Sequence, residues 1–111
     1  MDIIENRKRQ REQVIGHVSD FINGLNFKCT ALLIGSYARG DFNLWSDIDL
    51  LIIANFNGNP LQRLKNIDFP AGYETILLTP NEINKLKDKN TKFITDAFKD
   101  GIILRDDFNY Q

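Results

Sequence analysis

Apolar residues recur along this chain at two periods, one helical and one extended. Near the N-terminus, apolar side chains at three- and four-residue steps predict an amphipathic helix over residues 2–25, with Gly24 and Asn26 as stop signals. Two almost wholly apolar runs follow, and they predict strands over residues 28–34 and 47–54. Because these runs are so apolar, we expect both strands at the centre of a sheet.

The second half of the chain contains shorter elements that proline and glycine separate. The pattern predicts a helix over residues 60–68, a strand over 73–78, a helix over 80–89, a helix over 92–99 and a last strand over 102–104. Leu61, Leu64 and Ile67 would give the first of these helices its apolar edge. Thr79 and Glu82 have the spacing of a capping box, which marks the start of the next helix. These elements predict an α+β fold, a small mixed β-sheet with helices packed on it.

Length, composition and charge limit the class of protein. At 111 residues, 42% of them apolar, the chain suffices for a single domain over residues 1–111 with one core. The formal net charge of -1 gives no general attraction to nucleic acid or to a membrane, so we expect neither as a direct partner. The chain lacks a signal peptide's basic-then-apolar start and any run of membrane-spanning length, so we expect a cytoplasmic location. The basic run over residues 7–11 is interpreted as a solvated helix face, and residues 106–111 are expected to fray.

The stretch of residues 35–53 contains chemistry that folding alone does not explain. Asp47 and Asp49 stand at the head of an apolar run, and in an extended chain their side chains would share one face about 7 Å apart. Two carboxylates that close raise each other's pKa unless a cation neutralises them, and oxygen ligands suit Mg²⁺ or Mn²⁺. We therefore expect a divalent metal at this pair.

A turn at Gly35 and Ser36 ends the preceding apolar run. The residues after it can open a short helix whose free backbone N–H groups attract phosphate, so a phosphate site would face the metal across the turn. Two other motifs do not fit this stretch. Gly35 and Gly40 have the spacing of a P-loop, but Asp41 stands where that loop needs a lysine. Asp41 and Asn43 open like a calcium-binding EF-hand, but the later ligand positions of that loop hold unsuitable residues.

Three short motifs lie in this stretch: Gly35-Ser36, Arg39-Gly40 and Ser46-Asp47-Ile48-Asp49-Leu50. Together they resemble the motif set of the minimal nucleotidyltransferases, small members of the DNA polymerase β-like superfamily. The resemblance implies a nucleotidyltransferase fold, similar to the polymerase β palm. It also implies a metal-dependent enzyme that moves a nucleoside monophosphate, AMP from ATP in the expected case, to an acceptor hydroxyl and releases pyrophosphate.

The resemblance also implies a role for each motif residue. The nucleotide would be bound by Gly35, Ser36, Arg39 and Gly40, and the catalytic metal ligands would be Asp47, Asp49 and Glu74. The superfamily completes its metal cage with an aspartate on a later strand, and Glu74 is the substitute here. Strand alternation puts Glu74 on the same face as Ile76 and Leu78, where an unpaired charge is costly. If its strand neighbours that of Asp49, a spacing of about 4.8 Å brings the carboxylates within reach of one ion. The other interpretation is that Glu74 opens an edge strand and faces water.

Larger relatives carry a second, helical domain for the acceptor, and we expect none here, so the acceptor would come from another molecule. The resemblance implies a helical HEPN-type partner, an RNase toxin for which this chain would be the antitoxin. The alternative is a non-catalytic antitoxin that binds a metal or nucleotide and neutralises its partner by occlusion. We also expect self-association or an exposed apolar patch, because the eight phenylalanines include Phe42, Phe56 and Phe108 in predicted loops.

Overall fold

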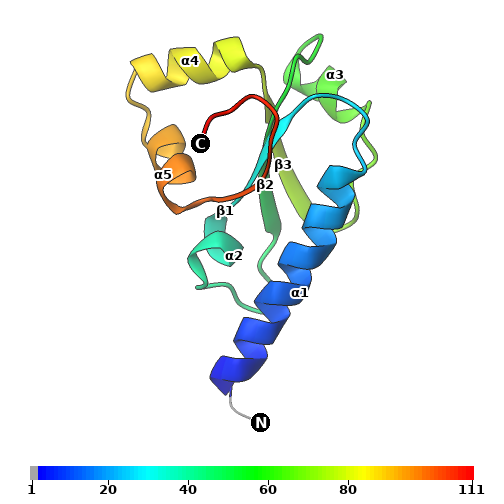
Figure 1. The fold of residues 1–111 in the computed structure, drawn as a ribbon, viewed down its shortest axis with the longest axis vertical. Helices are drawn as coiled ribbons and strands as arrows, with labels where there is room; N and C mark the ends of the chain where they lie inside the picture. The colour runs from blue at the N-terminus through cyan, green and yellow to red at the C-terminus, as the bar shows by residue number, and fades with distance from the viewer. Residues whose placement is uncertain (1–2) are drawn as a thin grey trace.

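The computed structural model describes residues 3–111, which form a four-stranded sheet and five helices (Figure 1). In chain order the elements are α1 (Ile3–Asn23), β1 (Thr30–Ile34), α2 (Gly35–Arg39), β2 (Ile48–Ile53), α3 (Pro60–Leu64), β3 (Tyr73–Leu78), α4 (Pro80–Asp88), α5 (Lys92–Asp100) and β4 (Ile102–Asp106). Residues 1 and 2, which include the predicted start of the first helix, lie outside the described residues. The predicted α+β class, with a mixed sheet and packed helices, is confirmed.

The sheet has the strand order β3-β2-β1-β4. β1 pairs antiparallel with both β2 and β4, whereas β2 and β3 run parallel. The central position predicted for the two apolar runs, now β1 and β2, is therefore confirmed. A parallel pair needs a crossover connection, and residues 54–72 supply it with α3 inside.

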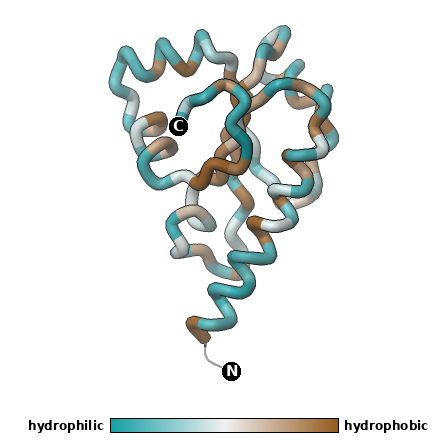
Figure 2. The backbone as a smooth tube through the Cα atoms, in the orientation of Figure 1, coloured by the Kyte–Doolittle hydropathy of each residue, from teal (hydrophilic) through white to brown (hydrophobic). Residues whose placement is uncertain are grey.

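Helices cover both faces of the sheet, and the alternation of strand residues divides the core in two. Ala31 and Leu33 of β1 point to the face that α1 covers. Leu32 and Ile34 point to the opposite face, under α4 and α5. Figure 2 shows apolar residues gathered in the sheet, whereas much of the outer helical surface is hydrophilic. All of β1 is buried because both of its faces are covered.

The first helix holds the connection between α2 and β2 through its arginines. Arg11 donates from Nε to the Tyr37 carbonyl at 2.7 Å and from Nη2 to the Ala38 carbonyl at 2.5 Å. Arg7 donates to the Phe42 carbonyl and lies over the ring of that residue. The interpretation of the basic run as a solvated face is therefore wrong for these two side chains, which position the segment after the glycine turn.

The third helix buries a charge where the sequence predicted an apolar edge. It ends at Leu64, four residues before the expected limit, and both Leu61 and Leu64 are exposed. Its buried residue is Arg63, which donates to the Leu77 carbonyl at 3.0 Å and to Glu82 at 2.6 Å. An arginine with a fixed set of acceptors can be buried where a hydrocarbon side chain was expected.

The expectation that residues 106–111 fray is also wrong. Asp106 is the last residue of β4, and its carboxylate accepts hydrogen bonds from Thr30 Oγ1 at 3.0 Å and from the Tyr110 and Gln111 backbone N–H groups at 2.9 Å. Asp107 accepts from the Cys29 backbone N–H group. β4 is thus two residues longer than the strand that the apolar pattern predicts, and its last residue ties the C-terminal segment to β1.

The phenylalanines expected on the surface are largely inside. Phe42 is 2% exposed and stacks on Tyr37 with 4.4 Å between ring centroids. Phe56 and Phe108 are half-buried. The exposed large apolar side chains belong to other residues, and among them Leu44 and Trp45 lie in the connection between α2 and β2. None of the helices within residues 3–111 has the length and apolar character needed to cross a membrane.

Candidate active site

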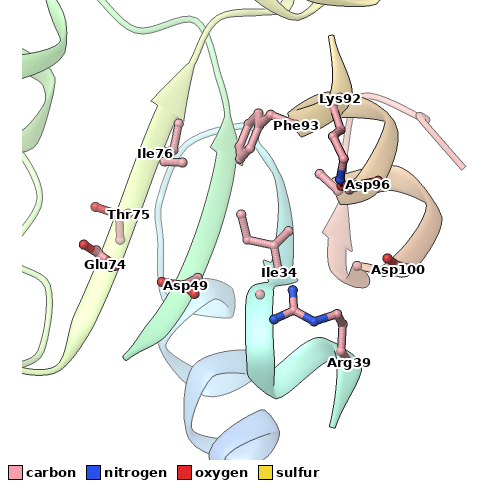
Figure 3. Close-up of a pocket in the computed structure, with 13 residues that line it drawn as sticks. Ile34, Arg39, Asp49, Glu74, Thr75, Ile76, Lys92, Phe93, Asp96 and Asp100 are labelled. Carbon is pink, nitrogen blue, oxygen red and sulfur yellow. The ribbon is translucent and has the colours of Figure 1, made fainter. Parts of the chain in front are cut away.

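Three strand ends meet on the face of the sheet that α5 covers. β1 ends there at Ile34, whereas β2 and the parallel β3 begin there, so Asp49 lies between Ile34 on one side and Glu74 on the other. A cleft of about 870 Å³ opens at this point, lined by strand residues, by the Gly35 turn and by α5 (Figure 3). A space of this size lies within the range of small-molecule sites, about 300–1,000 Å³.

Asp49 and Glu74 are direct neighbours across the parallel pair of strands. They stand in register with each other, and their carboxyl groups share a hydrogen bond. The strand of Glu74 therefore adjoins that of Asp49, which is the condition under which the two carboxylates could share one ion. β3 is also an edge strand and Glu74 is exposed, so both sequence interpretations of this residue describe part of its position.

The surroundings of Asp49 disfavour its charge. Partial burial, the hydrogen bond with Glu74 and the charges of Glu74 and Asp47 together raise the pKa of Asp49 to about 6, against a weaker opposing effect of Arg39. A shared proton is one way to relieve carboxylates at this distance, and a bound cation is the other. The site therefore suits a positive ligand at Asp49.

Gly35 allows the carboxylate to lie against the turn. Its φ of 72° falls in the left-handed region, and a β-carbon on this residue would overlap the Asp49 carboxylate. Glycine is required here for both reasons, since it carries no side chain and enters this conformation without strain. The predicted turn is thus the feature that admits Asp49 to the cleft wall.

Asp47 does not occupy the strand position that the sequence predicted for it. The strand was expected from residue 47, but β2 begins at Ile48 and Asp47 is exposed in the preceding connection. β1 pairs through Ile34 and then turns into α2, so no residue of β1 stands opposite Asp47. Asp47 is not among the residues that line the cleft, although its charge contributes to the raised pKa of Asp49.

The expected nucleotide-binding residues divide into two groups. Gly35 and Arg39 line the cleft, and Arg39 forms an exposed ion pair with Asp41 at 3.1 Å. Ser36 and Gly40 do not line it. Gly40 ends α2 in a left-handed conformation and donates its N–H to the Ser36 carbonyl, which is a role in the turn itself.

Sequence reasoning missed the wall that α5 contributes. This helix lines the cleft with Lys92, Phe93, Asp96, Ala97 and Asp100. Lys92 and Asp96 form an ion pair at 2.7 Å along the helix. The spacing of four residues between Lys92, Asp96 and Asp100 places them on one face, and this pattern was a readable signal.

The carboxylate oxygens of Asp49 and Glu74 are ligands that suit a hard divalent cation. No group of three His, Cys, Asp or Glu side chains within residues 3–111 is arranged to hold a metal. Mg²⁺ in proteins commonly uses one or two carboxylates and completes its shell with waters and substrate phosphates. Asp49 and Glu74 would hold such an ion, and the metal role of Asp47 stays a prediction.

Comparisons with known proteins agree with this geometry. The polymerase beta nucleotidyltransferase family model matches residues 23–107. Among solved structures, a candidate nucleotidyltransferase from Sulfolobus solfataricus aligns with a TM-score of 0.55 and 22% identity over 90% of this chain and 83% of that one, which confirms the expected nucleotidyltransferase fold. No curated protein matches the chain. The cleft at the Gly35 turn and the family match lead to one conclusion: this chain belongs to the polymerase beta nucleotidyltransferase family.

Proposed function

We propose that this protein is a metal-dependent nucleotidyltransferase that moves a nucleoside monophosphate, AMP from ATP in the expected case, to an acceptor hydroxyl. The observation that carries the proposal is the register of Asp49 and Glu74 across β2 and β3, beside the Gly35 turn in one cleft. A structural role alone gives no reason to hold two carboxyl groups together where two paired, largely apolar strands begin.

In this proposal Asp49 and Glu74 hold Mg²⁺ or Mn²⁺, and Asp47 approaches from the connection before β2. The metal would supply Lewis acidity, lowering the pKa of the acceptor hydroxyl and neutralising negative charge on the leaving pyrophosphate. Arg39 is the cation of the cleft wall nearest the turn, and it would exchange Asp41 for a phosphate oxygen. Its pair with Asp41 is exposed, so the exchange costs little.

The acceptor would be a hydroxyl of another macromolecule, with a helical HEPN-type protein as the expected partner and this chain as its antitoxin. The connection before Asp47 supports docking beside the cleft, because Leu44 is 79% exposed and Trp45 is 85% exposed. A turn holds them outward: the Trp45 N–H donates to Asn43 Oδ1 at 2.8 Å, and Ser46 Oγ accepts from the Asn43 N–H at 2.9 Å. A second copy of this chain is the other candidate for that surface.

A non-catalytic antitoxin is the second candidate function. The exposed position of Asp47, with no group of three metal-binding side chains within residues 3–111, favours this alternative. Such a protein would bind nucleotide or metal and neutralise its partner by covering the partner's active site.

The test is to incubate the protein with ATP, Mg²⁺ and the product of its neighbouring gene, the expected source of a HEPN-type partner. The proposal expects that the intact mass of the partner increases by one nucleoside monophosphate residue for each modified hydroxyl. Asp49→Asn should abolish this increase. An unmodified partner that is nevertheless bound and inhibited would establish the occluding antitoxin instead.

A further inference from the structure

We propose that Phe93 of α5 and Ile76 of β3 form the subsite for the nucleobase. The inference rests on the proposed function, since it assigns the part of the cleft that the metal and the triphosphate do not use. It also supplies, from within this small chain, a contact for the base.

The two side chains form an apolar end of the cleft. Ile76 is 40% exposed although it lies on the sheet face that α4 and α5 cover, because α5 stops short of this part of β3. Phe93 is half-buried and packs against the core beneath α5. Figure 3 places both at one end of the cleft, with Ile34 between them and the polar end. An aromatic face opposite an aliphatic wall suits a flat heterocycle.

The charges of the cleft give the nucleotide one orientation. Asp49, Glu74 and Arg39 lie at the end opposite Phe93 (Figure 3), where a metal and a phosphate-binding cation belong together. On α5 the charge of Lys92 is matched by Asp96 at 2.7 Å, and Asp100 adds a negative charge beyond it. Asp100 lies toward the Arg39 end, so the end of the cleft beside Phe93 offers a triphosphate only a lysine already paired with a carboxylate, and the phosphates would point to Arg39 and the metal while the base points to Phe93.

The test compares ATP, UTP and inorganic tripolyphosphate, each with Mg²⁺, by isothermal titration calorimetry. The variant is Phe93→Leu, which keeps an apolar side chain against the core and removes the aromatic face. Phe98→Leu is the matched control, because Phe98 is on the same helix but packs against Tyr110 at 5.7 Å between ring centroids, outside the cleft. Ile76→Ala tests the second wall at an exposed position.

The base subsite predicts that Phe93→Leu weakens ATP binding about tenfold, the usual effect of losing one aromatic partner of a base. Tripolyphosphate should bind Phe93→Leu, Ile76→Ala and the wild-type protein alike, and the wild-type protein should bind both ATP and UTP more tightly than tripolyphosphate. The Phe98→Leu control should leave all three affinities unchanged.

Two outcomes would overturn the subsite. One is an ATP affinity that Phe93→Leu does not change. The other is an equal weakening of ATP and tripolyphosphate binding in Phe93→Leu, which would place the phosphates at α5. Failure of the nucleotide site as a whole, on which the proposed function depends, looks different, because the wild-type protein would then bind neither tripolyphosphate nor ATP in a Mg²⁺-dependent way. A wild-type protein that binds ATP and tripolyphosphate equally would remove the base subsite while leaving the metal site in place.

Discussion

Gly35 and Asp49 lie so close that a β-carbon on residue 35 would overlap the Asp49 carboxylate. Gly35 follows the last residue of β1 and Asp49 is the second residue of β2, and their contact fixes where the carboxylate enters the cleft. The glycine of the turn is thus a direct condition for the position of the proposed metal ligand.

We therefore expect Gly35→Ala to displace Asp49 and to reduce nucleotidyl transfer about 100-fold, the scale of a misplacement of about 1 Å at a reacting group. Gly40→Ala is the matched control. Gly40 has a similar φ of 90°, but nothing lies within 4 Å of a β-carbon there. Each variant should lose about 1 kcal/mol of stability from the left-handed backbone, and only Gly35→Ala should lose transfer. Equal losses of transfer in both variants would show that the contact with Asp49 has no catalytic consequence.

Isosteric amide substitutions should distinguish the carboxylates that bind the metal from another carboxylate of the cleft. Asp49→Asn and Glu74→Gln are each expected to abolish transfer while thermal melting shows an intact fold, because the amide keeps the shape and removes the charge that a metal requires. Asp47→Asn is expected to do the same. Asp100→Asn is the control, since Asp100 lines the cleft from α5 without a predicted metal role. Near wild-type transfer in Asp49→Asn or Asp47→Asn would refute the aspartate-based metal site, and in Glu74→Gln it would end the metal role of Glu74 and remove the pair of carboxylates on which the proposal rests.

The raised pKa of Asp49 predicts a pH dependence of stability in the absence of divalent metal. Its pKa is about 6 when folded and 3.8 ordinarily, so between these values the folded protein binds more protons than the unfolded chain. The free energy of unfolding should therefore fall as the pH rises from about 4 to about 6 and then level off. Carboxyl groups with lowered pKa, such as Asp106 and Asp107, act in the opposite direction at lower pH.

Denaturant titrations of the wild-type protein and Asp49→Asn in EDTA, at pH 4.5 and pH 7, would isolate this contribution. Asp49→Asn keeps the other carboxyl groups, so the difference between the two proteins belongs to Asp49 and to the partners it shares a proton with. A wild-type stability that rises relative to the variant over this interval would contradict the crowding of carboxylates in the cleft.

Arg63 is expected to matter for stability and not for transfer. It connects α3 to the Leu77 carbonyl and to Glu82 at the start of α4. Arg63→Met should cost about 2 kcal/mol, the scale for losing hydrogen bonds from a buried charged group. Denaturant titration measures the loss, and Lys65→Met, at an exposed position beside it, is the control. A specific loss of transfer at a temperature where Arg63→Met is folded would assign this residue to the site.

The sequence predicted the strands better than it predicted the surfaces between elements. Apolar runs identify β1 and β2 as central because burial on both faces requires continuous apolar residues. The neighbourhood of Asp49 and Glu74 followed once β3 was placed beside β2. The first inference depends on the run of apolar residues, which a single sequence displays, whereas the second depended on the strand order, which the structure supplies.

Other features depend on which elements meet in space, and a single sequence does not display that. The burial of Arg63 was not predicted, because it depends on the Leu77 carbonyl of β3, which accepts a hydrogen bond from the arginine. The tail is ordered by hydrogen bonds between Asp106 and Thr30, 76 residues apart. The position of Phe93 in the cleft likewise depends on how α5 packs over β1. The sequence does show that the charged residues Lys92, Asp96 and Asp100 of the same helix recur every four residues.

The central claim is nucleotidyl transfer, and ATP labelled separately at its α- and γ-phosphates tests it most directly. The protein is incubated with each label, Mg²⁺ and the proposed HEPN-type partner, and the acceptor is separated from small molecules. We predict that the α-label becomes bound to the acceptor, that the γ-label leaves as pyrophosphate, and that Asp49→Asn prevents both. Label on the acceptor from the γ-phosphate, or from neither position while the partner is bound, would contradict the account.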